Sequence, residues 1–263
     1  FTKNLFFLLF FYFFKEKLIF LKLIISGRGR EIMYILSVST FSLNSSFSIL
    51  KKENNTLKTI FELDLHYNDI NNQSQLNIFP HFFKLAKDKV GINLKDIKEI
   101  IILNGPGFFT SLRIGTVISQ TLAFINKSDL YSIDTFKAVL NIFLYFYSEY
   151  VDTKAYILIA IKIANNKFKI GIFNINNYLE QQTYEEIIKT EFYNKLSELK
   201  NKLGDNLTVI SPNMETEEIE EIENLGLNFI DLKDLFTSSN IAKSTFFFNN
   251  FKKEDPTYVT INY

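Results

Sequence analysis

The segment 102–124, ILNGPGFFTSLRIGTVISQTLAF, constrains the fold of this chain more than any other stretch. The whole chain of 263 residues contains only nine Gly and four Pro, yet a Gly-Pro-Gly sequence stands here at 105–107. Arg113 follows it, and no other Arg occurs after Met33. The apolar run before the glycines and the helical pattern after them predict a buried strand, a tight turn and a helix, with Thr110 or Ser111 as N-cap.

The remaining sequence indicates a duplicated α/β architecture. Three short strand-like runs are followed by a helix, the strand before the glycines and a second helix, which gives the order βββαβα. A similar series of helix, hairpin and strand patterns follows from about residue 132. We therefore predict an N-terminal lobe over 33–130 and a C-terminal lobe over 131–263. The acidic run 214–224 is interpreted as the solvated face of a helix.

Residues 1–32 differ from the rest. The apolar run Leu5–Phe14 is shorter than the roughly 20 residues that a spanning helix needs. The Lys-Glu-Lys that follows it does not suit a signal peptide. We expect Met33 to be the start of the protein, and residues 1–32 to be translated upstream sequence or a disordered extension. The expected protein is cytoplasmic and not bound to a membrane.

Composition excludes several classes of site. The formal net charge is zero, so the chain alone has no basic excess for binding nucleic acid. Cysteine is absent, which excludes disulfides and thiolate metal ligands. The only histidines, His66 and His81, are too far apart in sequence for the H-x-x-x-H pair of a metallopeptidase.

The glycine turn is a candidate anion site. A helix that starts after a turn presents unpaired N–H groups and a partial positive charge. The pattern is neither a P-loop nor G-x-G-x-x-G, because it has no Lys at the turn and no third Gly. The candidate residues are Gly105, Pro106, Gly107, Thr110 and Arg113.

The helix after the turn carries a small-residue stripe, which we define as Ser111, Gly115, Ser119 and Ala123. Small residues every four positions allow another helix to approach closely. Apolar residues flank this stripe on both sides, so the helix needs cover beyond its own sheet. That cover is either the preceding helix, 76–90, or a partner molecule.

The segment as a whole resembles the G-P-G-S-F-T-G-L-R-I-G sequence of the TsaB (YeaZ) family. The matching residues are Gly105, Pro106, Gly107, Phe109, Thr110, Leu112, Arg113, Ile114, Gly115, Leu122, Ala123 and Phe124. Weaker matches occur in order from MYILSVST near Met33 to DPTYV near the end of the chain. The resemblance implies the duplicated lobes of the actin/Hsp70/sugar-kinase (RNase H-like) superfamily.

The resemblance also implies a function. Family members are non-catalytic subunits of the complex that makes N6-threonylcarbamoyladenosine at position 37 of tRNA. They heterodimerise with a TsaD-type transferase, a TsaE-type ATPase docks on the pair, and tRNA binds the assembled complex. The paralogues meet through the helices at 75–90 and 110–126. Here the implied interface residues are Leu76, Phe79, Phe83, Ser111, Leu112, Gly115, Ile118, Ser119 and Leu122.

Departures from the family pattern bear on nucleotide chemistry. Ser39 stands where the opening strand of the family often has Asp, which counts against nucleotide hydrolysis. Phe108 and Ser111 replace Ser and Gly, while Lys162 and Asn165 replace Asp and Arg of a later hairpin. No catalytic residue, metal or cofactor is therefore expected in this chain, and ATP or ADP is expected only at the interface of the complex. The alternatives are a small-molecule kinase or ATPase of the same superfamily, and a homodimeric interaction module.

Overall fold

The computed structural model describes residues 33–42, 44–54, 56–65, 75–150, 156–175 and 182–262. His66 and the predicted extension 1–32 lie outside these ranges. Within them, no helix is long and apolar enough to cross a membrane.

The first sheet contains six strands in the order β11-β5-β4-β1-β2-β3. Its strands are β1 (Met33–Ser39), β2 (Ser45–Glu53), β3 (Thr56–Leu65), β4 (Ile97–Leu103), β5 (Asp129–Ile133) and β11 (Lys252–Glu254). The three predicted strands are confirmed as the antiparallel meander β1, β2 and β3, and β4 and β5 join it in parallel. The helices that follow β3 and β4 are α2 (Gln75–Val90) and α3 (Phe109–Asn126).

The second sheet contains five strands in the order β10-β9-β6-β7-β8. Its strands are β6 (Tyr156–Ala164), β7 (Lys167–Asn174), β8 (Gln182–Ile188), β9 (Leu207–Ser211) and β10 (Asn228–Asp231). The associated helices are α5 (Lys189–Leu203) and α6 (Thr216–Asn224). The meander of β8, β7 and β6 followed by two parallel strands repeats the order of the first sheet, so the predicted duplication is confirmed.

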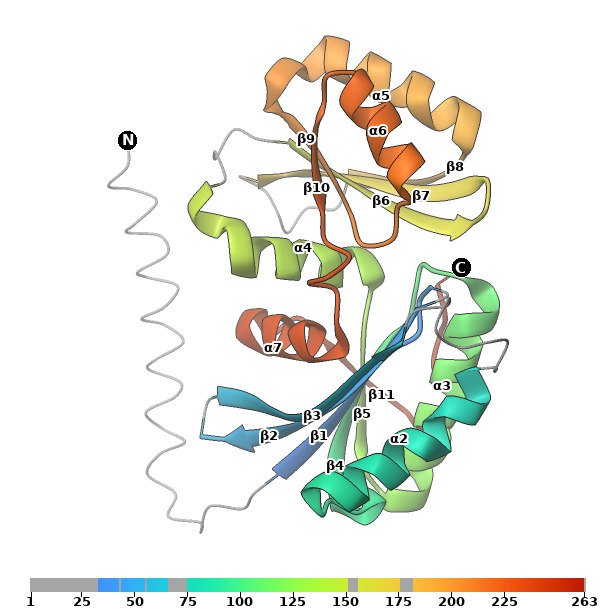
Figure 1. The fold of residues 1–263 in the computed structure, drawn as a ribbon, viewed down its shortest axis with the longest axis vertical. Coiled ribbons are helices and arrows are strands. Elements are labelled where there is room, and N and C mark those ends of the chain that lie inside the picture. Colours follow the sequence, from blue (N-terminus) through green and yellow to red (C-terminus); the bar gives the residue numbers. More distant parts are fainter. Residues whose placement is uncertain are drawn as a thin grey trace. The chain divides into compact units, whose positions relative to one another are not determined.

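Two helices lie between the sheets. They are α4 (Thr135–Tyr147) and α7 (Ser238–Phe248), which contact each other (Figure 1). Phe136 and Val139 of α4 pack against Ile159 of the second sheet, and Ala242 of α7 packs against Ile35 of the first. The outer faces are covered by α2 and α3 on the first sheet and by α5 and α6 on the second.

Short 3₁₀ turns in the described part of the chain are Leu94–Asp96, Ser148–Tyr150 and Gly204–Asn206.

Two details differ from the sequence prediction. Strands β5 and β11 were not predicted. Each is short and β11 is polar, so neither has a clear strand pattern in the sequence, and pairing with neighbouring strands stabilises them. The N-cap of α3 is Phe108, not Thr110 or Ser111, and it makes no side-chain capping bond. The helix begins earlier because the Phe108 carbonyl accepts from the N–H of Leu112 at 3.0 Å. At the end of α2, Gly91 has a φ of +71° and its N–H donates to the carbonyl of Lys87, which is how a glycine ends a helix.

Candidate partner-binding helix and turn

The turn between β4 and α3 is a junction of three chain segments. The N–H of Phe108 donates to the carbonyl of Phe41, in the β1–β2 loop, at 2.6 Å. The carbonyl of Gly105 accepts from the N–H of Thr135 at 2.7 Å, and Asn104 accepts from Asn262 near the chain end at 2.6 Å. These backbone groups are therefore engaged within the chain and hold the start of α3 in place.

Close approach explains the two glycines of this turn. Gly105 has a φ of +106°, and a Cβ atom there would collide with the carbonyl oxygen of Asn262. A Cβ at Gly107 would collide with the carbonyl oxygen of Phe41. Pro106 lies between them after a cis peptide bond. The glycines thus have a structural role at the turn, separate from any anion.

The small-residue stripe of α3 faces the protein's own interior, which corrects the idea that it admits a partner helix. Ser111, Gly115, Ser119 and Ala123 are all buried, and α3 packs on β4, β5 and β1. A Cβ at Gly115 would meet the hydroxyl of Thr40, at the end of β1. The small residues let the helix lie close to its own sheet and loop.

The other predicted interface residues that the structure describes are buried or half-buried. Phe79 and Leu112 are buried, while Phe83, Ile118 and Leu122 are half-buried and pack against the cluster beneath α2 and α3. The side chain of Leu76 lies outside the described part of the chain. Helix α2 covers one flank of α3, so the preceding helix supplies part of the cover that the sequence left open.

A different face of α3 is exposed. Phe109, Val117 and Phe124 are 51%, 58% and 70% exposed, which is unusual for large apolar side chains. Arg113 and Thr121 lie between them at helical spacing and are also exposed. We call these five residues the exposed α3 stripe. The same four-residue spacing was available in the sequence, but it does not say which side of an apolar helix meets the sheet.

Arg113 contacts the stripe itself. Its guanidinium carbon lies 5.3 Å from the ring centroid of Phe109, the distance of a cation–π contact. Within the described ranges Arg113 makes no ion pair, and Thr110 beside it is exposed. The charge of Arg113 is therefore available at the surface for a carboxylate or another anion.

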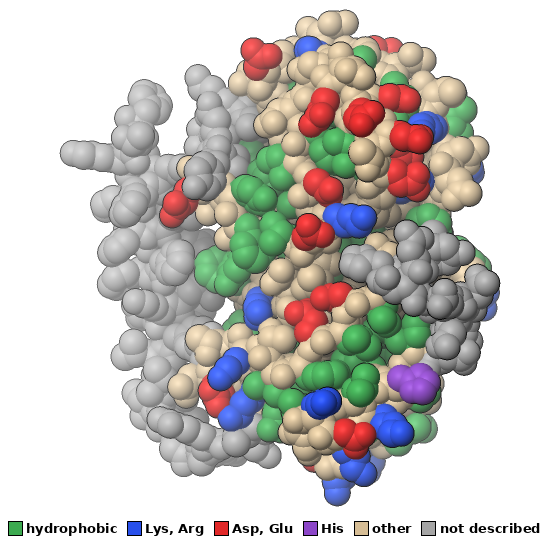
Figure 2. Space-filling view, in the orientation of Figure 1, with side chains coloured by type: hydrophobic (Ala, Val, Ile, Leu, Met, Phe, Trp, Pro, Cys, Tyr) green, Lys and Arg blue, Asp and Glu red, His purple; other side chains and the backbone are tan. Residues whose placement is uncertain are grey.

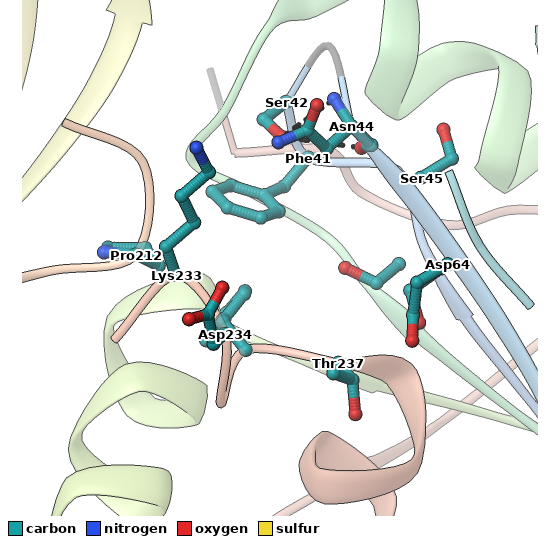
Figure 3. A pocket seen from close by; sticks show the side chains of 12 residues that line it. Phe41, Ser42, Asn44, Ser45, Asp64, Pro212, Lys233, Asp234 and Thr237 are labelled. Atoms are coloured by element: carbon teal, nitrogen blue, oxygen red, sulfur yellow. Dashed lines mark hydrogen bonds between the residues drawn. The ribbon is translucent and has the colours of Figure 1, made fainter. Parts of the chain in front are cut away.

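A small cavity lies at the carboxyl end of β1 (Figure 3). Its volume is about 120 Å³, well below the roughly 300 Å³ at which small-molecule pockets begin. Lys233 and Asp234 reach it from the loop after β10, opposite Asp64 on β3. The ring of Phe41 stands in this space and packs edge-to-face on Phe236 with centroids 4.8 Å apart. This cavity is too small for a mononucleotide.

Ser39 lines the same cavity and is buried, so the departure from Asp falls on the cavity wall. The described residues contain no group of three His, Asp or Glu side chains that could hold a metal ion.

The hairpin of β6 and β7 carries a buried ion pair that sequence reasoning missed. Lys162 is buried, and its ammonium lies 2.7 Å from Glu215 and 3.0 Å from Glu218. Burial alone would lower the pKa of Lys162, but the hydrogen bonds to the two glutamates outweigh it and raise the pKa. The hydrogen bond from Lys162 lowers the pKa of Glu215.

This pair corrects the interpretation of the acidic run as a purely solvated face. Glu218 is 1% exposed and joins α6 to the hairpin. The other acidic side chains of α6 are exposed or half-exposed, and acidic side chains gather over the upper part of the face in Figure 2. Asn165, the other departure in this hairpin, is exposed.

Comparisons with known proteins agree with this architecture. The family model for TsaD, tRNA N6-adenosine threonylcarbamoyltransferase, matches residues 70–206, which is more than half of the chain. No curated protein sequence matches. A solved structure of an uncharacterised protein similar to peptidase YeaZ, from Pseudomonas aeruginosa, is 14% identical with a TM-score of 0.57. That match covers 88% of this chain and 99% of the other.

A second structure, YeaZ from Pseudomonas aeruginosa, is 19% identical with a TM-score of 0.42 and covers 59% of this chain and 67% of that one. The predicted fold of duplicated α/β lobes and the resemblance to TsaB (YeaZ) are confirmed at the level of fold and family. The chain belongs to the TsaD family of tRNA N6-adenosine threonylcarbamoyltransferase.

Proposed function

We propose that the chain is a non-catalytic subunit of the complex that makes N6-threonylcarbamoyladenosine at position 37 of tRNA. It heterodimerises with a TsaD-type transferase, a TsaE-type ATPase docks on the pair, and tRNA binds the assembly in the cytoplasm. Membership of the TsaD family supports the link to this modification. In this proposal the two lobes, 33–130 and 131–263, together form the one subunit that binds the partner.

The single observation that carries the partner-binding role is the exposed α3 stripe. A row of large apolar side chains on one helix costs free energy in water, and such patches mark surfaces that another protein covers. Each buried side chain of this size contributes about 1.5–3 kcal/mol when a partner removes it from water. Leu85 on neighbouring α2 is 40% exposed and extends the apolar surface. Figure 2 shows apolar side chains gathered over the lower part of its view, where α2 lies in Figure 1.

The supporting role, rather than catalysis, rests on the cavity at Ser39. A kinase or ATPase of the superfamily would hold its nucleotide phosphates beside the first strand, whereas Phe41 and Phe236 leave only about 120 Å³ beside Ser39. The kinase alternative would require both rings to move. It predicts that the isolated chain hydrolyses ATP, and we expect no hydrolysis above the level of a heat-denatured sample.

The experiment that tests the function is depletion of the protein in its own cell, followed by measurement of the modified nucleoside in bulk tRNA by mass spectrometry. We expect N6-threonylcarbamoyladenosine to fall, and re-expression of the chain to restore it. An unchanged content of the modified nucleoside after depletion contradicts the proposal.

A homodimer is the second candidate, because the same exposed α3 stripe could pair with its own copy. Co-purification separates the two. We expect a TsaD-type partner in near-equimolar amount, whereas the homodimer predicts this chain alone, eluting from a size-exclusion column at twice the mass of one chain.

A further inference from the structure

A second, larger cavity is not explained by partner binding. It has a volume of about 900 Å³ and lies beside the Gly105 turn, at the carboxyl ends of β4 and β5. Cavities of this size are typical of sites that enclose a small molecule. Ligands of α/β folds also commonly bind beyond the carboxyl ends of parallel strands.

Three lysines from three separate elements line this cavity. They are Lys137 on α4, Lys169 on β7 and Lys252 on β11. The ammonium of Lys252 is held by the buried carboxylate of Glu254 at 3.1 Å. Lys137 and Lys169, in contrast, make no ion pair with any residue that the structure describes.

The acidic groups near these lysines are already engaged. Asp134, on the cavity wall, caps α4 by accepting from the N–H groups of Phe136 and Lys137 at 2.9 and 3.3 Å. Glu186 lies opposite Lys169 on the neighbouring strand, but its carboxylate is bound by Lys167 at 2.8 Å. Three lysines therefore face two carboxylates, Asp134 on the wall and Glu254 beside Lys252, which leaves an excess of one positive charge that favours an anionic ligand.

A buried polar atom is an independent pointer to a ligand. Asn104 lines the cavity and is only 9% exposed, and its Oδ1 has no hydrogen-bond partner among the described residues. Its Nδ2 donates to Ser132, whose hydroxyl donates to Glu254 at 2.5 Å. Buried acceptors without a donor are rare and costly, so this oxygen would gain a partner if the Asn104 amide turned toward a ligand with an N–H or O–H group.

We propose that this cavity binds a phosphorylated small molecule of about mononucleotide size. Its phosphate lies between Lys137 and Lys169, and its hydrogen-bond donor group faces Asn104. The half-buried apolar side chains of Phe251 and Ile261 line the cavity and contact the uncharged part of the ligand. This site is distinct from the exposed α3 stripe, and the inference does not depend on the proposed partner.

The test is isothermal titration calorimetry of the full chain with AMP, ribose 5-phosphate, adenosine and a short oligoribonucleotide without terminal phosphate. We expect AMP to bind, and adenosine to bind at least about tenfold more weakly because it lacks the phosphate. Ribose 5-phosphate separates recognition of the phosphate from that of the base, and we expect it to bind.

The variants are Lys137→Met and Lys169→Met, which keep the aliphatic stem and remove the charge. Each substitution should weaken AMP binding about tenfold. Lys84→Met, at an exposed position of α2 away from the cavity, should leave AMP binding unchanged. Unchanged denaturation midpoints show that the variants are folded. The proposal is overturned if AMP does not bind, if both cavity variants bind it as well as the Lys84 control does, or if only the oligoribonucleotide binds.

Discussion

The carbonyl oxygen of Phe41 accepts a hydrogen bond from the N–H of Phe108 at 2.6 Å, while the Phe41 ring packs on Phe236. Phe41, in the β1–β2 loop, therefore contacts both the start of α3 and the loop after β10. The glycine turn exists to permit this contact, because only a residue without Cβ fits at position 107 beside the Phe41 carbonyl.

Gly107→Ala should therefore destabilise the fold. The added Cβ would collide with backbone, which cannot move as a flexible side chain does, so we expect a loss of about 3 kcal/mol in the free energy of unfolding. Gly91→Ala is the matched control, because its Cβ would have nothing within 4 Å. It should cost about 1 kcal/mol, from left-handed backbone strain alone. Urea denaturation measures both, and equal losses would contradict the close approach at Gly107.

Lys162→Met should cost about 3 kcal/mol, because it removes the closest charge partner of the buried Glu218 carboxylate. That carboxylate then keeps only the N–H of Glu215 at 3.0 Å and the ammonium of Lys189 at 3.7 Å among the described residues. The control is Lys167→Met on the same hairpin, whose pair with Glu186 is about half exposed. Exposed pairs contribute less than about 1 kcal/mol. Chemical denaturation compares the two variants, and a similar cost for both would show that burial of the Lys162 pair has no effect on stability.

The same pair predicts a loss of stability in acid. Because Lys162 lowers the pKa of folded Glu215 below its ordinary value of 4.5, the pair contributes stability above that value. This contribution is lost as the pH falls through the lowered pKa of the folded state. The free energy of unfolding, measured from about pH 6 down to about pH 3, should fall less steeply for Glu215→Gln than for the natural chain. If the free energies of unfolding of the two chains fell in parallel with pH, the lowered pKa of Glu215 would be contradicted.

The sequence predicted most of the fold because strand and helix periodicity is local. It missed β5 and β11, whose pairing, such as Lys252 with Ser132, joins distant segments. From the sequence, the small-residue stripe of α3 was also assigned to the interface with a partner. The helix is apolar around most of its surface, and only Thr40 and the sheet decide which side is buried. The ion pair of Lys162 could not be predicted from the sequence, because Glu215 and Glu218 lie on a distant segment that only the fold brings beside β6.

The residues of the predicted site lie on α2, on the turn before α3 and on α3 itself. The turn residues 105–107 lead directly into α3, which carries Arg113, and one face of this helix has exposed apolar side chains. The face is formed by Phe109, Val117 and Phe124 rather than by the small residues. The large cavity had no signal in sequence, because its lysines come from three elements that only the fold brings together.

The most direct test of the central claim is the affinity of the chain for a TsaD-type partner from the same cell, measured by calorimetry with variants of the exposed α3 stripe. Val117→Glu and Phe124→Glu place a charge where the partner is proposed to cover apolar surface. Tyr258→Glu is the control, since Tyr258 is 72% exposed but lies outside α3. We predict that each stripe variant weakens binding at least about 30-fold, the equivalent of about 2 kcal/mol, with the denaturation midpoint unchanged. Binding by both stripe variants as tight as that of the Tyr258 control would contradict the account.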